Sequence, residues 1–460
     1  MTCAFDFPLD RLTGQLRSLP TTLAKKLAMN TIVLALFSAV LIVTNTAAQD
    51  SSSAARYEPT WANVQPQRLI KHAVQSGANS QQNGAALVKA IETLVPGDRL
   101  EIASGEYSVS RMWDIGVSGT ADAPVWIVAA NDATVVITRP DNKQNVLNVG
   151  QAGPVSFLCF RGLEFTGGSH GLRLGKCSDV WLDQSHIHHT GQVCLSANSA
   201  DTQRLYITRN HIHHGDGHAE GMYLGGNDAT YIMSESVIAL NHVHDCRGDQ
   251  GDGIEVKQGS WGNLIAENHI HDTNYPCITV YGTGGKPVNI IERNLCYRSG
   301  DHLMQVQGEA IVRNNVLIGS AGSAFASTDH QGKTLNLQVI HNTIVNEGHA
   351  FSGGSWNSRE GMVLANNILY SRNENAIHFA NGGAGVTIAG NVVVGNGPKE
   401  GCVKGRGLED FVNVTWAGGQ NQAIPTDDAP FEFASKTFLI ETDFAGKSRA
   451  EILTTGAIAR

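Results

Sequence analysis

From about Arg99 onward the chain alternates short apolar and polar stretches, which glycine, asparagine and aspartate separate. Alternation with a period of two indicates short β-strands that each direct one face inward. Hardly any stretch after Pro96 has the 3.6-residue periodicity of a helix. Just before it, residues Asn83 to Leu94 form an amphipathic pattern that ends at Pro96-Gly97, and this predicts one short helix.

A short unit of Asn, any residue and an apolar residue recurs along the chain. Its first positions are Ser185, Asn210, Asn241, Asn268, Asn294, Asn314, Asn342, Asn366 and Gly390, in steps of 20 to 31 residues. Strands of three to five residues cannot bury a face alone, so they must stack on the next turn. We expect the recurring Asn to be a turn residue that tolerates left-handed geometry and bonds to its neighbour in the stack. The repeat therefore predicts an all-β fold, a right-handed parallel β-helix of three sheets with a short N-terminal capping helix.

The N-terminus has the pattern of a signal peptide. Lys25 and Lys26 precede an apolar run from Ile32 to Val43, which ends in small residues. The run is shorter than the roughly 20 residues that span a bilayer, although an uncleaved membrane anchor is the alternative. We expect export to the periplasm or the cell exterior, with no integral membrane domain after cleavage. The predicted parts are a signal peptide at 1–48, an N-terminal cap with the helix at 49–98, the β-helix at 99–399 and a C-terminal cap at 400–460.

Composition limits the partners. Removal of residues 1–48 leaves 29 basic and 40 acidic residues, a net charge of −11, so we expect no nucleic acid as a partner. One locally basic groove would still suffice to bind an anionic polymer. Seven cysteines remain, an odd number without zinc-binding spacing, and we expect mostly buried free thiols. The oligomeric state stays open.

Aligning a second strand of each turn places outward side chains in columns. With apolar residues directed inward, one column is Arg173, Cys194, Tyr223, Glu255, Thr279 and Gln305, and the next is Gly175, Ser196, Gly225, Lys257, Tyr281 and Gln307. Neighbours in a column lie about 4.8 Å apart. The candidate catalytic residues are Lys257 and Tyr281. The candidate substrate-binding residues are Arg173, Tyr223, Glu255, His302, Gln305 and Gln307.

This constellation suits β-elimination on a uronic acid, in which a base removes the proton next to the carboxylate and a cation neutralises that carboxylate. Lys257 or Tyr281 would be the base; a lysine serves when its pKa is lowered, whereas the adjacent Glu255 would raise it. Glu220 and Asp252 fall on adjacent turns and form a second feature. Such a carboxylate pair either shares a proton or holds a hard cation, and we expect a calcium site there.

Histidines accompany four of the repeated units. They are His186, His188, His189, His211, His213, His214, His242, His244, His269 and His271. The first and third residues after the unit's first position share the outward face, which predicts two parallel ladders of imidazoles. Stacked imidazoles can bind a transition metal, but ring packing along the flank of the coil is the simpler interpretation.

The segment from Gln250 to Asn268, which includes Asp252-Gly-Ile-Glu-Val-Lys257, resembles the pectate-lyase-like β-helix superfamily. Within it, the segment is similar to polysaccharide lyase family 6, the alginate lyases and chondroitinase B. In that family acidic calcium ligands shortly precede a catalytic Lys. The resemblance implies Asp252 as the nearer ligand and Lys257 as the base, while Gln250 stands at the farther ligand. The family's catalytic Arg in the next turn is absent here, and Tyr281 would act instead as the acid.

The sequence thus predicts a secreted polysaccharide lyase that cleaves an acidic, uronate-containing glycan by β-elimination. Three alternatives stay open. A C5-epimerase uses the same proton abstraction. A glycoside hydrolase needs two carboxylates, which Glu220 with Asp252 or Glu255 would supply. A non-catalytic glycan-binding or adhesive solenoid would use its outward His, Asn and Tyr side chains as a contact surface.

Overall fold

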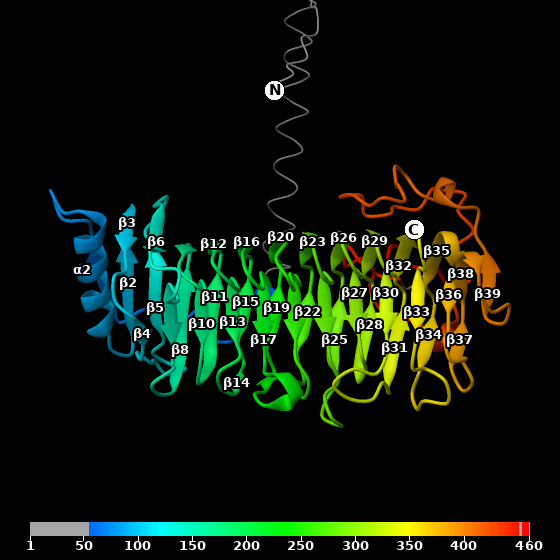
Figure 1. The fold of residues 1–460 in the computed structure, drawn as a ribbon, viewed down its shortest axis with the longest axis horizontal. Helices are drawn as coiled ribbons and strands as arrows, with labels where there is room; N and C mark the ends of the chain where they lie inside the picture. Colours follow the sequence, from blue (N-terminus) through cyan, green and yellow to red (C-terminus); the bar gives the residue numbers. More distant parts are fainter. Residues whose placement is uncertain (1–54, 450–452, 460) are drawn as a thin grey trace, which may run out of the picture. The chain divides into compact units, whose positions relative to one another are not determined.

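The computed structural model describes residues 55–449 and 453–459, so the expected signal peptide at 1–48 lies outside the described residues. The chain divides into two compact units, residues 1–57 and 58–460. In the first unit the structure describes the short 3₁₀ helix η1 (Ala55–Tyr57). All the described strands belong to the second unit. They form three parallel sheets of 15, 13 and 11 strands that run along its length (Figure 1).

The 15-stranded sheet begins one turn before Arg99, the residue at which the sequence predicted the first strand of the coil. Its first strand pairs with the second in the register Arg68↔Asp98. That first strand is largely exposed on both faces, so its sequence lacks a clear apolar alternation. The strands are β1 (Arg68–His72), β2 (Asp98–Ile102), β5 (Val125–Ala129), β8 (Val155–Arg161), β11 (Cys177–Asp183), β14 (Thr202–Gln203), β15 (Tyr206–Thr208), β18 (Met233–Ser234), β19 (Val237–Ala239), β22 (Leu264–Ala266), β25 (Asn289–Glu292), β28 (Ala310–Arg313), β31 (Leu337–Ile340), β34 (Val363–Ala365) and β37 (Thr387–Ala389).

The 13-stranded sheet contains the histidine strands. Its strands are β3 (Gly105–Ser108), β6 (Val135–Arg139), β9 (Glu164–Gly167), β12 (His186–Thr190), β16 (His211–Gly215), β20 (His242–Cys246), β23 (His269–Thr273), β26 (Leu295–Ser299), β29 (Val316–Ser320), β32 (Thr343–Asn346), β35 (Ile368–Asn375), β38 (Asn391–Asn396) and β39 (Cys402–Lys404). The histidine strands are consecutive in this sheet, in the order β12, β16, β20 and β23 (Figure 1).

The 11-stranded sheet carries the candidate catalytic side chains. Its strands are β4 (Asp114–Ile115), β7 (Leu147–Val149), β10 (Leu172–Leu174), β13 (Leu195–Ala197), β17 (Met222–Leu224), β21 (Ile254–Val256), β24 (Ile278–Val280), β27 (Met304–Val306), β30 (Phe325–Ser327), β33 (Phe351–Gly353) and β36 (Ile377–His378). Most of these strands have three residues, so the chain leaves the sheet quickly and the turns on either side supply much of the surface.

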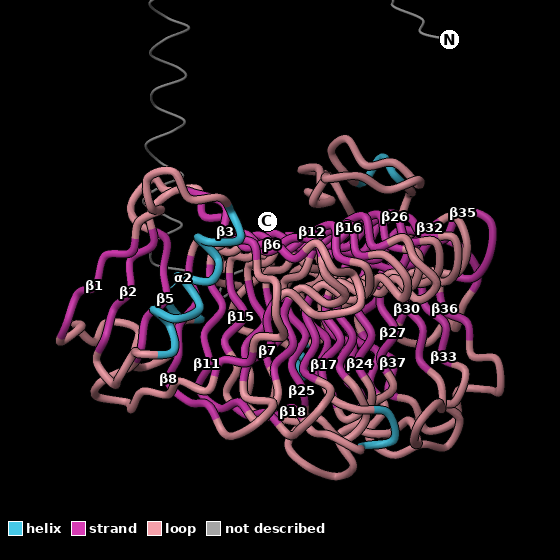
Figure 2. The backbone as a smooth tube through the Cα atoms, turned by 60° about the vertical axis from the view of Figure 1, so that its left-hand side comes forward, coloured by secondary structure: helices cyan, strands magenta, loops and turns pink. Residues whose placement is uncertain are grey.

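One α-helix, α2 (Ser80–Glu92), packs against β3 at the start of the coil (Figure 2). It begins three residues before Asn83, where the apolar pattern predicted it, because Asn79 and Gln82 form a capping box over the polar first turn. A side chain could not fit at Gly84, since a Cβ atom there would lie 2.1 Å from the carbonyl oxygen of Ser108. The buried residues of α2 join the core of the coil. The sequence prediction of one short helix near the N-terminus is confirmed.

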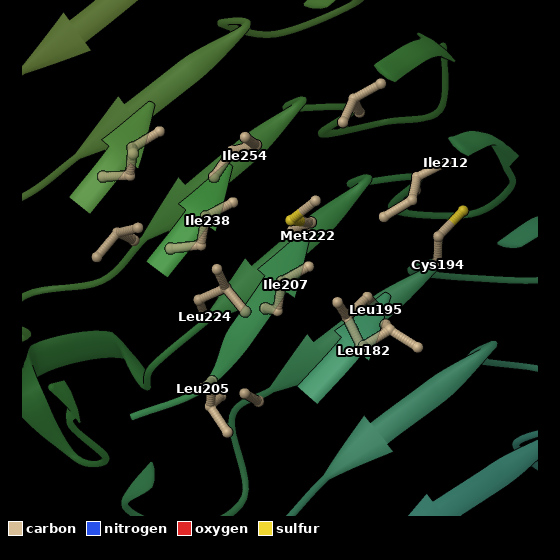
Figure 3. Packing of buried hydrophobic residues seen from close by; sticks show 14 of the residues in the cluster. Leu182, Cys194, Leu195, Leu205, Ile207, Ile212, Met222, Leu224, Ile238 and Ile254 are labelled. Atoms are coloured by element: carbon tan, nitrogen blue, oxygen red, sulfur yellow. The ribbon is translucent and has the colours of Figure 1, made fainter. Parts of the chain in front are cut away.

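The interior of the coil is a continuous apolar core built from the inward side chains of all three sheets (Figure 3). Burial of such side chains is the main stabilising contribution, about 1.5–3 kcal/mol for each fully buried Leu, Ile or Val. The seven described cysteines are free, and six of them are buried. The expectation of buried free thiols is therefore confirmed for six, while Cys402 is half-buried.

An asparagine ladder occupies one inner corner of the coil. Its members are Asn210, Asn241, Asn268, Asn294, Asn315, Asn342, Asn367 and Asn391, and each side-chain amide donates to the Oδ1 of the next. The predicted stacking is correct, but three positions were wrong by one residue: Asn314, Asn366 and Gly390 precede the true members. The left-handed conformation falls on these preceding residues, for example Asn314 at φ 55° and Gly390 at φ 66°.

The segment after β39 packs against the later turns of the coil. It contains the 3₁₀ helices η3 (Leu408–Asp410) and η4 (Lys436–Phe438). The buried Arg449 side chain anchors it, because it donates to Asn314 Oδ1 at 2.9 Å and to the carbonyl of Ala457 at 2.7 Å. A fourth 3₁₀ helix among the described residues, η2 (Asn227–Ala229), lies within the coil. Among the described residues, no helix has the length and apolar character needed to cross a membrane.

Candidate functional site

The short strands of the 11-stranded sheet align the candidate side chains across turns. The register pairs Tyr223 with Glu255, Glu255 with Thr279 and Thr279 with Gln305. Four of the six residues predicted for the first outward column therefore lie in adjacent positions. They come from β17, β21, β24 and β27.

Cys194 was wrongly assigned to this column. Ser196 pairs with both Arg173 and Tyr223, so Ser196 belongs to the first column and not to the second. Cys194 is fully buried in the core beside Leu195 (Figure 3). Because Val193, Cys194 and Leu195 are all apolar, the alternation could not fix the register of this strand.

Lys257 lies directly after β21, and its backbone N–H donates to the carbonyl of Leu224 at 2.8 Å. Its ammonium group forms an ion pair with Glu255. The same Nζ atom lies 4.4 Å from the ring centroid of Tyr223 and 5.5 Å from that of Tyr281. The side chains of Lys257 and Glu255 are each 6% exposed. The structure thus brings the buried Lys257, Tyr281 and Glu255 together with the half-buried Tyr223, a group here called the Lys257 cluster.

The environment keeps Lys257 protonated at neutral pH. Burial lowers its pKa, but the charge and hydrogen bond of Glu255 and the Tyr223 hydroxyl outweigh burial, so the pKa lies above its ordinary value. Burial and the nearby carboxylates likewise raise the pKa of Tyr281 far above its ordinary value. Both groups are therefore proton donors in this state rather than bases.

Three buried carboxyl groups face this single lysine. Burial and the charge of Glu255 raise the pKa of Asp252 well above its ordinary value, although Thr279 donates a hydrogen bond of 2.6 Å to Asp252. Burial also raises the pKa of Glu255 and of Glu220. Glu220 Oε2 has no hydrogen-bond partner among the described residues. The site therefore holds more acidic groups than one lysine neutralises.

Glu220 and Asp252 are the calcium ligands that the sequence predicted. Calcium takes six to eight oxygen ligands. Among the described residues, the groups of three or more His, Cys, Asp or Glu side chains whose ligand atoms lie close together do not include Glu220 or Asp252. These carboxylates therefore give no support to a calcium site.

Two loops meet over the Lys257 cluster. One contains η2 and the other spans residues 328–335. Asn227 Oδ1 accepts hydrogen bonds of 3.1 Å from the Tyr223 hydroxyl and from Gln331 Nε2, and the Asp228 N–H donates to Gln331 Oε1 at 3.1 Å. The ring of His330 lies 5.4 Å from that of Tyr281. The repeat pattern did not predict these loops, although its two longest steps, of 31 and 28 residues, contain them.

Three predicted substrate-binding residues, Gln307, Arg173 and His302, are not members of the Lys257 cluster. Gln307 is buried, and its Oε1 accepts from the N–H of Gly282 at 3.2 Å. Arg173 lines a separate depression of about 640 Å³ together with His170. His302 contacts the carbonyl of Ser323 through Nδ1 at 3.0 Å, before β27.

The histidines form the two predicted ladders on the 13-stranded sheet. The inner ladder is His186, His211, His242 and His269, and the outer ladder is His188, His213, His244 and His271. Consecutive rings within a ladder stack with centroids 4.7–5.2 Å apart. Burial and the neighbouring imidazoles lower the pKa of His186 to about 4 and that of His242 to about 3.

Two family models match parts of the chain. The model described as right handed beta helix region matches residues 141–288. The chain is a right-handed parallel β-helix. The model described as periplasmic copper-binding protein (NosD) matches residues 227–421 of this β-helix. No curated protein sequence matches this chain.

Solved structures share the fold at low sequence identity. XylC in complex with xylose is 10% identical with a TM-score of 0.54, over 85% of the β-helix chain and 98% of the other. Pectate lyase Pel9A is 15% identical with a TM-score of 0.50, over 86% and 98%. A mutant of the PL6 family alginate lyase AlyGC is 14% identical with a TM-score of 0.50, over 80% of this chain and 58% of that one. At these identities the similarity establishes the fold alone.

Proposed function

We propose that this β-helix cleaves an acidic, uronate-containing polysaccharide by β-elimination at the Lys257 cluster. The observation that carries the proposal is a buried, protonated lysine held between two phenol rings and a carboxylate. This arrangement offers a cation for the uronate carboxylate and a phenol that can give up a proton. Two solved structures with the same fold are a pectate lyase and an alginate lyase, which is in keeping with the proposal.

Because Lys257 and Tyr281 both hold their protons, their roles differ from those that the sequence suggested. Lys257 neutralises the substrate carboxylate, and this carboxylate replaces Glu255 as the partner of the ammonium group. Glu255 then acts as the base, since burial raises its pKa and a carboxylate of raised pKa accepts a proton more readily. Tyr281, which holds its proton, acts as the acid.

The elimination balances with these groups. Glu255 takes the proton from C5 of the uronate, and the electron pair of that C–H bond forms the C4–C5 double bond. The bond between C4 and the glycosidic oxygen breaks, and Tyr281 donates its proton to the leaving oxygen. The products are one chain with a new unsaturated end and one with a free hydroxyl. No step requires a metal ion.

Access to the cluster requires the two covering loops to separate. Their mutual hydrogen bonds, between Asp228 and Gln331 and between Gln331 and Asn227, are exposed to solvent. Each bond of this kind contributes about 0.5–1.5 kcal/mol, so breaking the two bonds costs about 1–3 kcal/mol.

The test uses the mature protein with alginate, pectate, chondroitin sulfate and heparan sulfate as substrates. Ultraviolet absorbance follows the conjugated double bond. We expect absorbance to rise with one substrate, to fail in Lys257→Ala and to persist in the control Lys399→Ala, at an exposed lysine far along the chain. Full turnover in Lys257→Ala would overturn the proposal. New reducing ends without a rise in absorbance would indicate hydrolysis and would also overturn it. A changed uronate composition, with neither new reducing ends nor a rise in absorbance, would indicate epimerisation and would overturn it as well.

The proposed site of action is outside the cytoplasm. The signal-peptide pattern at 1–48 supports this, and one of the matching family models describes periplasmic proteins. Cell fractionation of the tagged protein tests it, with recovery in the periplasm or the medium as the expected result. Recovery of the full-length chain in the cytoplasm would contradict it.

A further inference from the structure

The histidine ladders lie on a different sheet from the Lys257 cluster and take no part in the proposed elimination. Three all-histidine triplets repeat along them, and in each the ligand atoms lie within 4.8 Å of one another. The triplets are His186–His211–His213, His211–His242–His244 and His242–His269–His271. Each takes two consecutive rings of the inner ladder and one ring of the outer ladder.

Ring stacking alone does not explain these contacts. In each triplet an inner imidazole directs Nε2 at the Nε2 of the outer imidazole one turn further on. The distances are 2.7 Å for His186 to His213, 2.7 Å for His211 to His244 and 2.9 Å for His242 to His271. Each contact is a hydrogen bond that one shared proton makes. A metal ion takes the place of that proton when the two nitrogen atoms move to about 3.3 Å apart, the separation of two ligands at about 2.0–2.1 Å in tetrahedral geometry.

The other nitrogen of each outer ring is held by the residue that follows it in the chain. His244 Nδ1 contacts Asp245 at 2.8 Å, and His271 Nδ1 contacts Asp272 at 2.6 Å. A carboxylate on Nδ1 fixes the ring and directs Nε2 toward the inner ladder, and a carboxylate partner of this kind is the usual environment of a metal-binding histidine. In the first triplet, His214 contacts His213 Nδ1 at 2.6 Å.

The chemistry of the ligands selects the class of ion. Neutral imidazoles suit zinc, copper and nickel, whereas calcium and magnesium require oxygen ligands. A depression of about 820 Å³ borders the residues that hold the outer rings, and its lining includes His214 and Asp245 but none of the triplet histidines.

We propose that the ladders bind two divalent transition-metal ions, at the first and the third triplet, and that the middle triplet stays empty. The middle triplet shares His211 with the first and His242 with the third, so it cannot fill while they are filled. The first and third share no residue. Their separation of two turns is about 10 Å, twice the spacing between neighbouring strands.

Metal-free mature protein titrated with Cu²⁺ alone, and separately with Zn²⁺ alone, tests the stoichiometry by calorimetry and by equilibrium dialysis. We expect two ions per chain, with nitrogen hyperfine structure in the electron paramagnetic resonance spectrum of the Cu²⁺ form. His213→Gln and His271→Gln each reduce the stoichiometry from two ions to one. His244→Gln is the matched control, because it alters only the middle triplet among the three, and it retains both ions.

Several outcomes would overturn the proposal. No binding by the unaltered protein would mean that the ladders are a hydrogen-bonded chain of imidazoles. Loss of an ion in His244→Gln would mean that the middle triplet is filled, or that the mixed group of His214, His244 and Asp245 is the site. More than two tightly held ions would exclude the alternating arrangement. Circular dichroism of each variant, with and without Zn²⁺, separates loss of a ligand from loss of the fold.

Discussion

Lys257 also stabilises the fold, because its removal leaves Glu255 buried without a counter-charge. Breaking a buried ion pair by removing one partner costs about 3–5 kcal/mol. We therefore expect Lys257→Ala to unfold at a markedly lower temperature than the unaltered protein in scanning calorimetry. The double variant Lys257→Met with Glu255→Gln removes both charges and should recover most of the loss. An unchanged melting temperature in Lys257→Ala would show that Glu255 is already neutral.

The asparagine ladder stabilises the coil at a second set of single residues. Asn294 Nδ2 donates to the Ile265 carbonyl and to Asn315 Oδ1, while Asn294 Oδ1 accepts from the backbone and the side chain of Asn268. Since each of these four bonds contributes about 0.5–1.5 kcal/mol, Asn294→Ala should destabilise the protein by about 2–6 kcal/mol in urea unfolding. Asn274→Ala, which removes an exposed side chain, is the control. Equal midpoints for the two variants would contradict the role of the ladder.

Single-residue register was the least predictable feature of the sequence. The pairs Asn314-Asn315 and Asn366-Asn367 both offer an Asn at either position, and only the left-handed turn before the strand decides which one faces inward. Cys194 illustrates the same limit, because three consecutive apolar residues give no alternation. By contrast, Glu255, Lys257 and Tyr281 were placed correctly relative to one another, since Ile-x-Val recurs unambiguously in β21 and β24.

At the scale of elements, Gln331 links the two loops that cover the Lys257 cluster. Gln331→Ala removes both hydrogen bonds between the loops and leaves the sheet unchanged. We expect faster backbone hydrogen exchange in residues 328–335 and a higher turnover number on long polymer, because opening becomes easier. Gln338→Ala, at an exposed position of β31, is the control. Slower turnover in Gln331→Ala would mean that the loops position the substrate rather than obstruct it.

The elements themselves were predictable to different degrees. Stacked strands follow from local alternation repeated at each turn, so the sequence revealed them directly. The start of α2 depends on a polar capping box, which the apolar pattern does not register. The contact between Asn227 and Gln331 joins loops from turns far apart in the sequence, and no local pattern predicts such a pairing.

At the scale of the whole coil, each turn contacts its neighbours, so the ends of the stack need their own protection. The N-terminal end is covered by α2, and the later turns are covered by the segment after β39. The C-terminal contact is polar as well as apolar: His341 is fully buried and lies against Asn366, whose side chain also donates to the carbonyl of Ser435. One of the contacts that hold this segment therefore includes a titratable ring.

Acid should weaken this attachment. Burial lowers the pKa of His341 to about 3, and the nearby Arg449 adds to the effect. An unfolded histidine has a pKa of about 6.5, so below that pH the unfolded chain binds a proton that the folded chain does not. Stability is then lost progressively as the pH falls from about 6.5 toward 3, because ring protonation beside Arg449 is unfavourable in the folded state.

Melting temperatures at pH 7, 6, 5 and 4, combined with limited proteolysis of the segment after β39, measure this dependence. His341→Gln keeps a polar side chain that does not titrate, and we expect its melting temperature to fall less steeply between pH 7 and pH 4 than that of the unaltered protein. His378→Gln, at a half-buried position of β36, is the control, and its melting temperature should fall as steeply as that of the unaltered protein. If both variants fall in parallel with the unaltered protein, His341 does not set the pH dependence, and the ladder histidines His186 and His242, whose pKa values burial also lowers, to about 4 and about 3, account for it.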